Sequence, residues 1–410
     1  MNVFIMRIRD DMSLDHAFLE TVSRQVGGAF YVFDDDIFRS NYQGLRERLR
    51  LHWPGTDVAY AMKANYMPAI VDLLASMEGY AEVVSRFEYE IARQALPGKR
   101  IIFNGPVKRE ADLRLALEEG SQINLDSFQE IESLKRLSGE FGRLRVGLRV
   151  CFSSPHLASR FGFEVETGEL KRALKLLSNI DRLELVALHC HATCRTLGVE
   201  DPVNRTRQLC ELASSLVTEH SIETLNIGGG LMGEMSTFLM SQFDFPLPSL
   251  NAYADAIGEA FVRYRPSAVS RLVVEPGISM VGNAMCLVAR VMEVRQRRHG
   301  WQALLDTSIN SVNPTRSSIQ PDLLTVSPRI RTANCRLYRL VGHTCMEHDV
   351  ICEALTADLE EGDFVVVENR GAYSLNYTPP FIVPAPAVIN RQGDVLKRAD
   401  DARQILEIYN

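Results

Sequence analysis

The sequence lacks the features that mark several classes of protein. No window approaches the run of about 18 apolar residues that a membrane-spanning helix needs. The apolar stretch after Met1 is broken by Arg7 and Arg9 and has no small-residue cleavage site, so we expect no signal peptide. The net charge is −7 and the only notable basic cluster is RQRR at 295–298. We therefore expect neither a membrane nor a nucleic acid as a partner.

The cysteine pattern gives no sign of a metal site or of a disulfide framework. The eight cysteines form no CxxC pair and no Cys/His metal spacing, so we predict no metal site. In a chain of this size they need not form disulfides, and the cytoplasm fits the pattern best. Hydrophobic residues make up 46% and charged residues 24% of the 410 residues, which is ordinary for a globular protein. This length exceeds one ordinary core, so two domains are expected.

Between residues 57 and 277, short apolar runs alternate with segments of helical periodicity, such as FQEIESLKRL at 128–137. Eight runs are strand candidates: 57–65, 80–85, 100–105, 122–127, 143–152, 183–192, 224–230 and 271–277. Eight βα units in about 220 residues are what a (β/α)8 TIM-type barrel requires, and in that fold reactive residues gather at the carboxyl ends of the strands. The residues at these ends are Lys63, Ser85, Asn104, Asp126, Arg149, His191, Gly228–Gly230 and Glu275.

After residue 280 the pattern changes to β-rich segments without intervening helices. It predicts a C-terminal, mostly antiparallel β domain. AFYVFDD at 29–35 has the same strand-like character, so we expect it to pair with that domain. The expected organisation is an N-terminal segment (1–36) packing with the β domain, an α/β barrel (37–278) and the C-terminal β domain (279–410).

Lys63 ends the apolar strand YAMKAN. Partial desolvation by its apolar neighbours would favour the neutral amine, which can attack an aldehyde. A strand-end lysine that snorkels to solvent is equally compatible with the motif. The motif alone leaves the two interpretations balanced.

Three further motifs end barrel strands. The three glycines of NIGGGL (226–231) would let backbone N–H groups approach a phosphate, although a tight turn needs glycines too. Glu275 in VVEPGIS could pair with a ring nitrogen, but EPG is also a common turn. We expect the two histidines of HCHAT, His189 and His191, on opposite faces of the strand end, with one pointing into the barrel mouth and one structural.

The distal domain holds two more candidates. Cys345 lies in the polar segment GHTCMEHD (342–349), where partial exposure would make thiol chemistry accessible. In ENRGAYSLNY (368–377), a glycine before Ala372 and Tyr373 predicts a strained turn that presents Tyr373.

In this order and spacing the motifs resemble the fold-type III pyridoxal-phosphate (PLP) decarboxylases, the group of diaminopimelate, ornithine and arginine decarboxylases, over roughly residues 29–390. The resemblance implies PLP as the cofactor and an amino acid as the substrate. The implied cofactor residues are Lys63 as the Schiff-base lysine, His191 stacking on the ring, Gly228, Gly229 and Gly230 at the phosphate, Glu275 at the ring nitrogen, and Tyr373 at phosphate and substrate. Glu88, Asn104 and Arg149 resemble the supporting polar shell.

The resemblance further implies that Cys345 reaches the neighbouring subunit's active site and protonates the product after CO2 leaves. A head-to-tail homodimer with shared active sites follows from that arrangement. Two alternatives remain open: an amino-acid racemase on the same fold, and a non-catalytic regulatory paralogue. A barrel-type PLP carrier lacks a β domain, and residues 280–410 argue against it.

The chain departs from the family pattern where substrates are recognised. Ile278 follows EPG where the family has an arginine, and Met346 follows Cys345 where the family has an acid, with Glu347 one residue later. Other departures are Asn313 in place of an Arg-Pro pair, serines at 317 and 318 where ornithine decarboxylases have an aspartate, and Cys194 in place of a phosphate-contacting serine. These changes resemble decarboxylases of siderophore or antibiotic-type pathways, whose substrates are larger amino-acid conjugates. Arg316 is the candidate carboxylate anchor, and Met346, Glu347 and Tyr373 complete the expected substrate-binding set.

Overall fold

The computed structural model describes residues 14–153, 159–192, 197–329 and 335–409. Contacts divide the chain into two units. One unit comprises 39–234 and 245–280, and the other comprises the residues up to 38, 235–244 and 281–410. The segment 235–244, which the sequence placed inside the barrel, groups with the second of these units. The domain boundaries expected after residues 36 and 278 stay a prediction.

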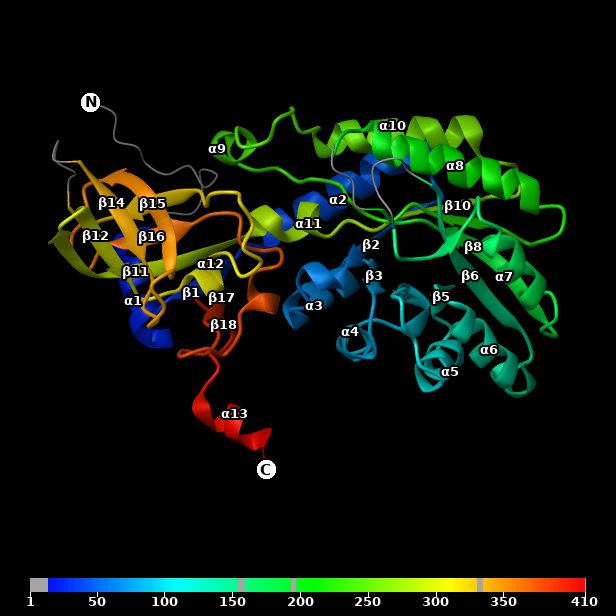
Figure 1. Cartoon of the computed structure of the whole chain (residues 1–410), viewed down its shortest axis with the longest axis horizontal. Helices are drawn as coiled ribbons and strands as arrows, with labels where there is room; N and C mark the ends of the chain where they lie inside the picture. Colours follow the sequence, from blue (N-terminus) through cyan, green and yellow to red (C-terminus); the bar gives the residue numbers. More distant parts are fainter. Residues whose placement is uncertain (1–13, 154–158, 193–196, 330–334, 410) are drawn as a thin grey trace. The chain divides into compact units, whose positions relative to one another are not determined.

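The first unit contains a closed barrel of eight parallel strands (Figure 1). These are β2 (Thr56–Ala61), β3 (Tyr80–Val83), β4 (Ile101–Phe103), β5 (Gln122–Leu125), β6 (Leu144–Cys151), β8 (Leu183–His189), β9 (Thr224–Asn226) and β10 (Arg271–Val274). The ring closes because β10 pairs with β2 and β5 pairs with β6. A short strand, β7 (Phe163–Glu164), also pairs with β6. The expected TIM-type barrel is confirmed.

Helices follow the barrel strands, as the 3.6-residue periodicity predicted. They are α3 (Pro68–Ser76), α4 (Arg86–Ala92), α5 (Glu110–Glu118), α6 (Phe128–Leu137), α7 (Glu169–Leu177), α8 (Glu200–Leu216) and α10 (Leu250–Tyr264). Ser85 and Ser127 cap α4 and α6, and each accepts the N–H of a glutamate three residues later, Glu88 or Glu130. Inside the barrel, Ala59, Ile102 and Val273 pack together from β2, β4 and β10. Ser85 therefore has a structural role as a helix cap.

The strands end earlier than the sequence predicted. β2 ends at Ala61 rather than at residue 65, and Lys63 lies in a 3-10 turn, η1 (Met62–Ala64). β9 ends at Asn226, so the glycine run lies wholly in the loop that follows. The polar and glycine residues that follow the strands therefore belong to βα loops, which carry the reactive residues in this fold.

The second unit is built on a mixed sheet (Figure 1). Its strands are β1 (Phe30–Phe33), β11 (Met285–Arg297), β12 (Gly300–Leu305), β13 (Leu323–Val326), β14 (Arg336–Val341), β15 (Val350–Ala357), β16 (Phe364–Val367), β17 (Ala387–Asn390) and β18 (Val395–Lys397). Only β1–β17 and β12–β14 pair in parallel among the described strands of this sheet. The N-terminal strand β1 pairs with β11 and β17, which confirms that it joins the C-terminal β domain.

Short helices complete the second unit: α1 (His16–Val26), α9 (Thr237–Met240), α12 (Ile309–Val312) and α13 (Ala402–Glu407). Leu19 and Val22 of α1 pack against the apolar face formed by β1, β11, β16 and β17, which makes the core of this unit. Helices α2 (Asp35–His52) and α11 (Ile278–Val281) each contain residues of both units. Among the described residues, no helix is long and apolar enough to cross a membrane.

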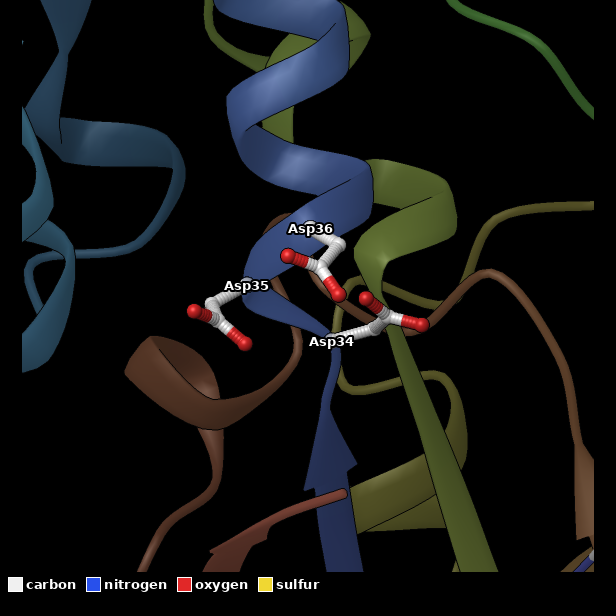
Figure 2. A group of neighbouring side chains, drawn as sticks. All are labelled: Asp34, Asp35 and Asp36. Carbon is white, nitrogen blue, oxygen red and sulfur yellow. The ribbon is translucent and has the colours of Figure 1, made fainter. Parts of the chain in front are cut away.

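Three consecutive aspartates stand at the start of α2 (Figure 2). Asp34 caps the helix by accepting the N–H of Ile37 at 3.1 Å, and acids in the first turn suit the positive end of the helix dipole. Arg391 lies 3.6 Å from a carboxylate oxygen of Asp34 and 3.2 Å from one of Asp36. Figure 2 shows the Asp34 and Asp36 carboxylates on the same side of the helix start. Asp34 and Asp36 are thus explained as a helix cap and a first-turn acid, both paired with Arg391.

Candidate active site at the barrel mouth

A cavity of about 500 Å³ opens within the barrel unit at the carboxyl ends of the strands. This volume suits a cofactor-sized ligand. The residues that line it lie near or after the carboxyl ends of six different strands: Lys63, Glu82, Val84, Asn104, Gly105, Pro106, Arg149, Ser159, Arg160, Phe161, His189, His191, Ala192 and Glu275. Six of the residues named from the sequence therefore meet in one place: Lys63, Asn104, Arg149, His189, His191 and Glu275.

Lys63 projects its amine into this cavity. Its neighbours in η1, Met62 and Ala64, are buried, whereas the Lys63 side chain is 32% exposed. The Nζ atom lies 2.5 Å from Oε2 of Glu82, whose side chain is 1% exposed. The sequence left a snorkelling surface lysine and a nucleophile balanced, and the contact with a buried carboxylate favours a lysine held in place for chemistry.

Glu82 is the main residue that sequence reasoning missed. It lies within β3, and Asn104 donates from Nδ2 to its Oε1 at 3.0 Å and to Oε1 of Glu275 at 2.7 Å. Asn104 thus links the carboxylate beside Lys63 to the carboxylate at the end of β10. An acid inside the otherwise apolar run YAEVV was the available signal, because an acid in a buried barrel strand must face polar partners.

Glu275 is 2% exposed and is surrounded by hydrogen-bond donors. Asn226 donates to Oε1 at 2.6 Å, and His189 Nε2 lies 3.1 Å from Oε2. Burial would raise the pKa of this carboxyl, but the charge and hydrogen bond of His189, together with the charge of Lys63, hold the pKa well below its usual value. The structure therefore presents an ionised carboxylate on the cavity wall.

The expectation for the tandem histidines was wrong. His189 and His191 are two residues apart, and side chains two apart along a strand share a face, so both line the cavity. The N–H of Gly229 donates to Nδ1 of His191 at 2.9 Å, which places the proton of a neutral ring on Nε2. Burial, followed by the charges of Lys63 and Arg205, lowers the pKa of His191 well below its usual value. His191 is a neutral ring.

The glycine run forms a loop that larger residues could not. Gly228 has φ +68°, and a Cβ there would lie 2.6 Å from Cβ of His191. A Cβ on Gly229 would lie 2.3 Å from the carbonyl oxygen of Glu275. Backbone that must stay free of side chains beside an imidazole and a backbone carbonyl suits the close approach of an anionic ligand group.

Two other polar residues named from the sequence support the cavity wall. Arg149 donates to Asp126 at 2.9 Å and packs 4.6 Å from the ring centre of Phe161. Glu88 accepts the N–H of Val84 at 2.8 Å. Burial, with a smaller contribution from the charge of Glu82, raises the pKa of Glu88 to about 7. Each side chain therefore anchors a loop at the barrel mouth.

The remaining candidates belong to the unit built on the mixed sheet. Cys345 and Glu347 are exposed and Met346 is half-buried, in the loop between β14 and β15. Asp349 organises this loop, because its carboxylate accepts the N–H of Thr344 at 3.0 Å, the O–H of Thr344 at 2.5 Å and the N–H of Ile309 at 2.7 Å. The cysteine thus stands on a fixed loop.

Arg316 and Tyr373 both have left-handed backbone, with φ +54° in each case. The strained turn predicted at Tyr373 is confirmed, and the Tyr373 ring lies 6.2 Å from that of Tyr377. Arg316 is exposed and donates to Oδ1 of Asn310 at 2.7 Å. Cys194 lies outside the described residues. The functional roles of these side chains stay predictions.

Comparison with known proteins identifies the class. The family model described as "Pyridoxal-dependent decarboxylase, pyridoxal binding domain" matches residues 40–282, and the chain belongs to this family. The diaminopimelate decarboxylase of Pseudomonas aeruginosa is 29% identical over 94% of each chain. That of Aquifex aeolicus is 25% identical over 88% of this chain and 86% of the relative.

Solved structures share the fold. Diaminopimelate decarboxylase from M. jannaschii in complex with L-lysine has a TM-score of 0.82 at 24% identity, covering 93% of this chain and 92% of that chain. The lysine/ornithine decarboxylase of Vibrio vulnificus has a TM-score of 0.75 at 23% identity, covering 91% of this chain and 97% of that chain. The resemblance to fold-type III decarboxylases is confirmed, and the protein is a PLP-dependent amino-acid decarboxylase. The racemase and regulatory alternatives are therefore not favoured.

Proposed function

We propose that Lys63 carries the PLP and that the barrel cavity holds it. His191 would pack against the ring, Glu275 would face the ring nitrogen, and Gly228–Gly230 would receive the phosphate. The observation that carries this proposal is that a lysine amine, an ionised buried carboxylate and a neutral imidazole line one cavity of about 500 Å³.

The side chains around the cavity suit these tasks. When bound, PLP supplies an electron sink for the electron pair left behind as CO2 departs. Asn104 and Asn226 hold Glu275 so that its carboxylate can keep a proton on the ring nitrogen. The neutral His191 ring can lie against an aromatic ring without adding positive charge. Glu82 is placed to hold the proton of Lys63 Nζ when the amine is released.

The residues of the other unit complete the proposal. Cys345 would return a proton to the α-carbon of the product, acting in the active site of the neighbouring subunit of a head-to-tail homodimer. Arg316, Met346, Glu347 and Tyr373 would contact the substrate, and Tyr373 would also contact the cofactor phosphate. The exposed thiol on a loop fixed by Asp349 supports this reading. The cytoplasmic location also stays a prediction.

The substrate is proposed to be an amino acid or an amino-acid conjugate of a specialised biosynthetic pathway, such as siderophore or antibiotic production. Ile278 and Met346 support this substrate proposal, because each puts an apolar side chain where the family pattern has a charged residue. Arg316 is the proposed replacement for the lost carboxylate anchor. A substrate with a different distal group from diaminopimelate or ornithine is expected to fit best.

The decisive experiment measures CO2 release from a panel of substrates by the purified chain. The panel holds diaminopimelate, lysine, ornithine, arginine and citrate- or peptide-conjugated diamino acids. We expect a conjugate to be turned over most efficiently and Lys63→Ala to abolish both turnover and the cofactor absorbance band. Preferred turnover of diaminopimelate would contradict the substrate proposal, and an unchanged band in Lys63→Ala would contradict the lysine assignment.

Subunit complementation tests the homodimer. Lys63→Ala and Cys345→Ala are each expected to be inactive, but mixing them allows heterodimers in which one site draws both residues from unaltered chains. Random exchange would restore roughly a quarter of the wild-type activity. Mixtures that stay inactive although the subunits exchange would show that Lys63 and Cys345 of one site come from the same chain.

A further inference from the structure

Arg205 projects from α8 to the glycine run. The residue is 7% exposed, and its guanidinium donates to the carbonyl oxygen of Ala192 at 2.6 Å and to that of Gly229 at 2.7 Å. A Cβ built on Gly230 would lie 3.8 Å and 3.9 Å from its two terminal nitrogens. The guanidinium therefore lies beside the loops that follow β8 and β9, within ordinary contact distance of the last glycine of the run.

The positive charge of Arg205 acts on two residues of the loop that follows β8, His191 and Cys190. It contributes to the lowered pKa of His191, after burial and the charge of Lys63. It also opposes the effect of burial, which raises the pKa of Cys190 to about 11. Two side chains just after β8, beside the glycine run that follows β9, thus experience the field of this guanidinium.

The residue after the EPG turn, Ile278, contributes no positive charge near the glycine run. Ile278 begins α11 with an apolar side chain. A phosphate group carries close to two negative charges and is stabilised by a nearby guanidinium, more so where water is excluded. Arg205 is a buried cation whose position beside the glycine run is fixed by two hydrogen bonds.

We propose that Arg205 supplies, from helix α8, the positive charge that stabilises the cofactor phosphate at Gly228–Gly230. The inference rests on the assignment of those glycines to the phosphate under the proposed function. Arg205 acts in cofactor binding, and the two carbonyl contacts hold its guanidinium in place for that task.

The test compares PLP with pyridoxal, which lacks the phosphate. The full-length chain is freed of cofactor with hydroxylamine and titrated with each compound, and the absorbance of the Lys63 adduct gives the two dissociation constants. Arg205→Met is expected to weaken PLP binding by about tenfold or more and to leave pyridoxal binding nearly unchanged. Arg205→Lys, which keeps the charge, is expected to retain most of the preference for PLP.

Matched variants separate charge from structure. Arg207→Met, on an exposed position of the same helix where Arg207 pairs with Glu211 at 3.6 Å, is expected to change neither constant. Arg205→Gln serves as the second neutral variant if Arg205→Met does not fold. Equal weakening of PLP and pyridoxal, or an Arg205→Lys variant as weak as the neutral ones, would overturn the inference. A wild-type chain without preference for PLP would instead overturn the assignment of the glycine run.

Discussion

Glu88 should make the stability of the chain depend on pH in the neutral range. The residue is 7% exposed, and burial raises the pKa of its carboxyl to about 7 from an ordinary value of 4.5. A carboxyl with a raised pKa keeps its proton in the folded chain at pH values where the unfolded chain has lost it. The folded state therefore binds more protons between these two values, and stability falls as pH rises from about 4.5 to about 7.

The magnitude follows from the two pKa values. Their difference corresponds to about 3 kcal/mol of lost stability once the pH exceeds both, of which about 2 to 3 kcal/mol is lost between pH 5 and pH 8. Glu88→Gln removes the titrating group and keeps an oxygen that can accept the N–H of Val84. The variant should therefore gain stability relative to the wild type by this amount on going from pH 5 to pH 8.

Urea denaturation of the cofactor-free chain at both pH values measures this difference. Glu90→Gln is the matched control, because Glu90 lies on the same helix with a 59% exposed side chain paired to Arg86. Its effect on stability should be small and nearly the same at both pH values. The reasoning on burial would be refuted if Glu88→Gln changed the free energy of unfolding equally at pH 5 and pH 8.

Three further outcomes are expected. Lys108→Met should lower the free energy of unfolding by about 3 to 5 kcal/mol, because it leaves Glu130 buried without the amine that lies 3.0 Å away. Adding Glu130→Leu should recover part of this loss in urea denaturation, and no recovery would contradict the ion-pair argument. Gly229→Ala should abolish the cofactor absorbance band, since its Cβ would lie 2.3 Å from the carbonyl oxygen of Glu275. A normal band would show that the loop can shift to accommodate the methyl group. Asp349→Ala should speed alkylation of Cys345 by iodoacetamide by loosening the loop, and an unchanged rate would show that the carboxylate contacts do not hold it.

The barrel was predictable because each strand is a short apolar run and each helix has its own periodicity. The strand ends were not, since an apolar run such as 57–65 continues past the last paired residue, Ala61.

Parts of the site were predictable to different degrees. Glycines and acids at strand ends are visible in the sequence, and Lys63, the glycine run and Glu275 were found in this way. Glu82 was missed because its partner, Lys63, is nineteen residues away, in the turn that follows another strand. Arg205 was missed because a basic residue on an amphipathic helix resembles any other surface residue until its end is seen to reach the glycine run.

The sequence by itself determined the residue types and their order: a lysine, histidines, glycines and a glutamate, each following an apolar run that forms a barrel strand. Only the tertiary structure decided which of them touch. Closing the barrel brings Asn104, Asn226 and His189 around one carboxylate, and that burial among donors is what keeps Glu275 ionised. The physical reason is that hydrogen bonds and desolvation depend on distances across the barrel, which spacing along the chain does not encode.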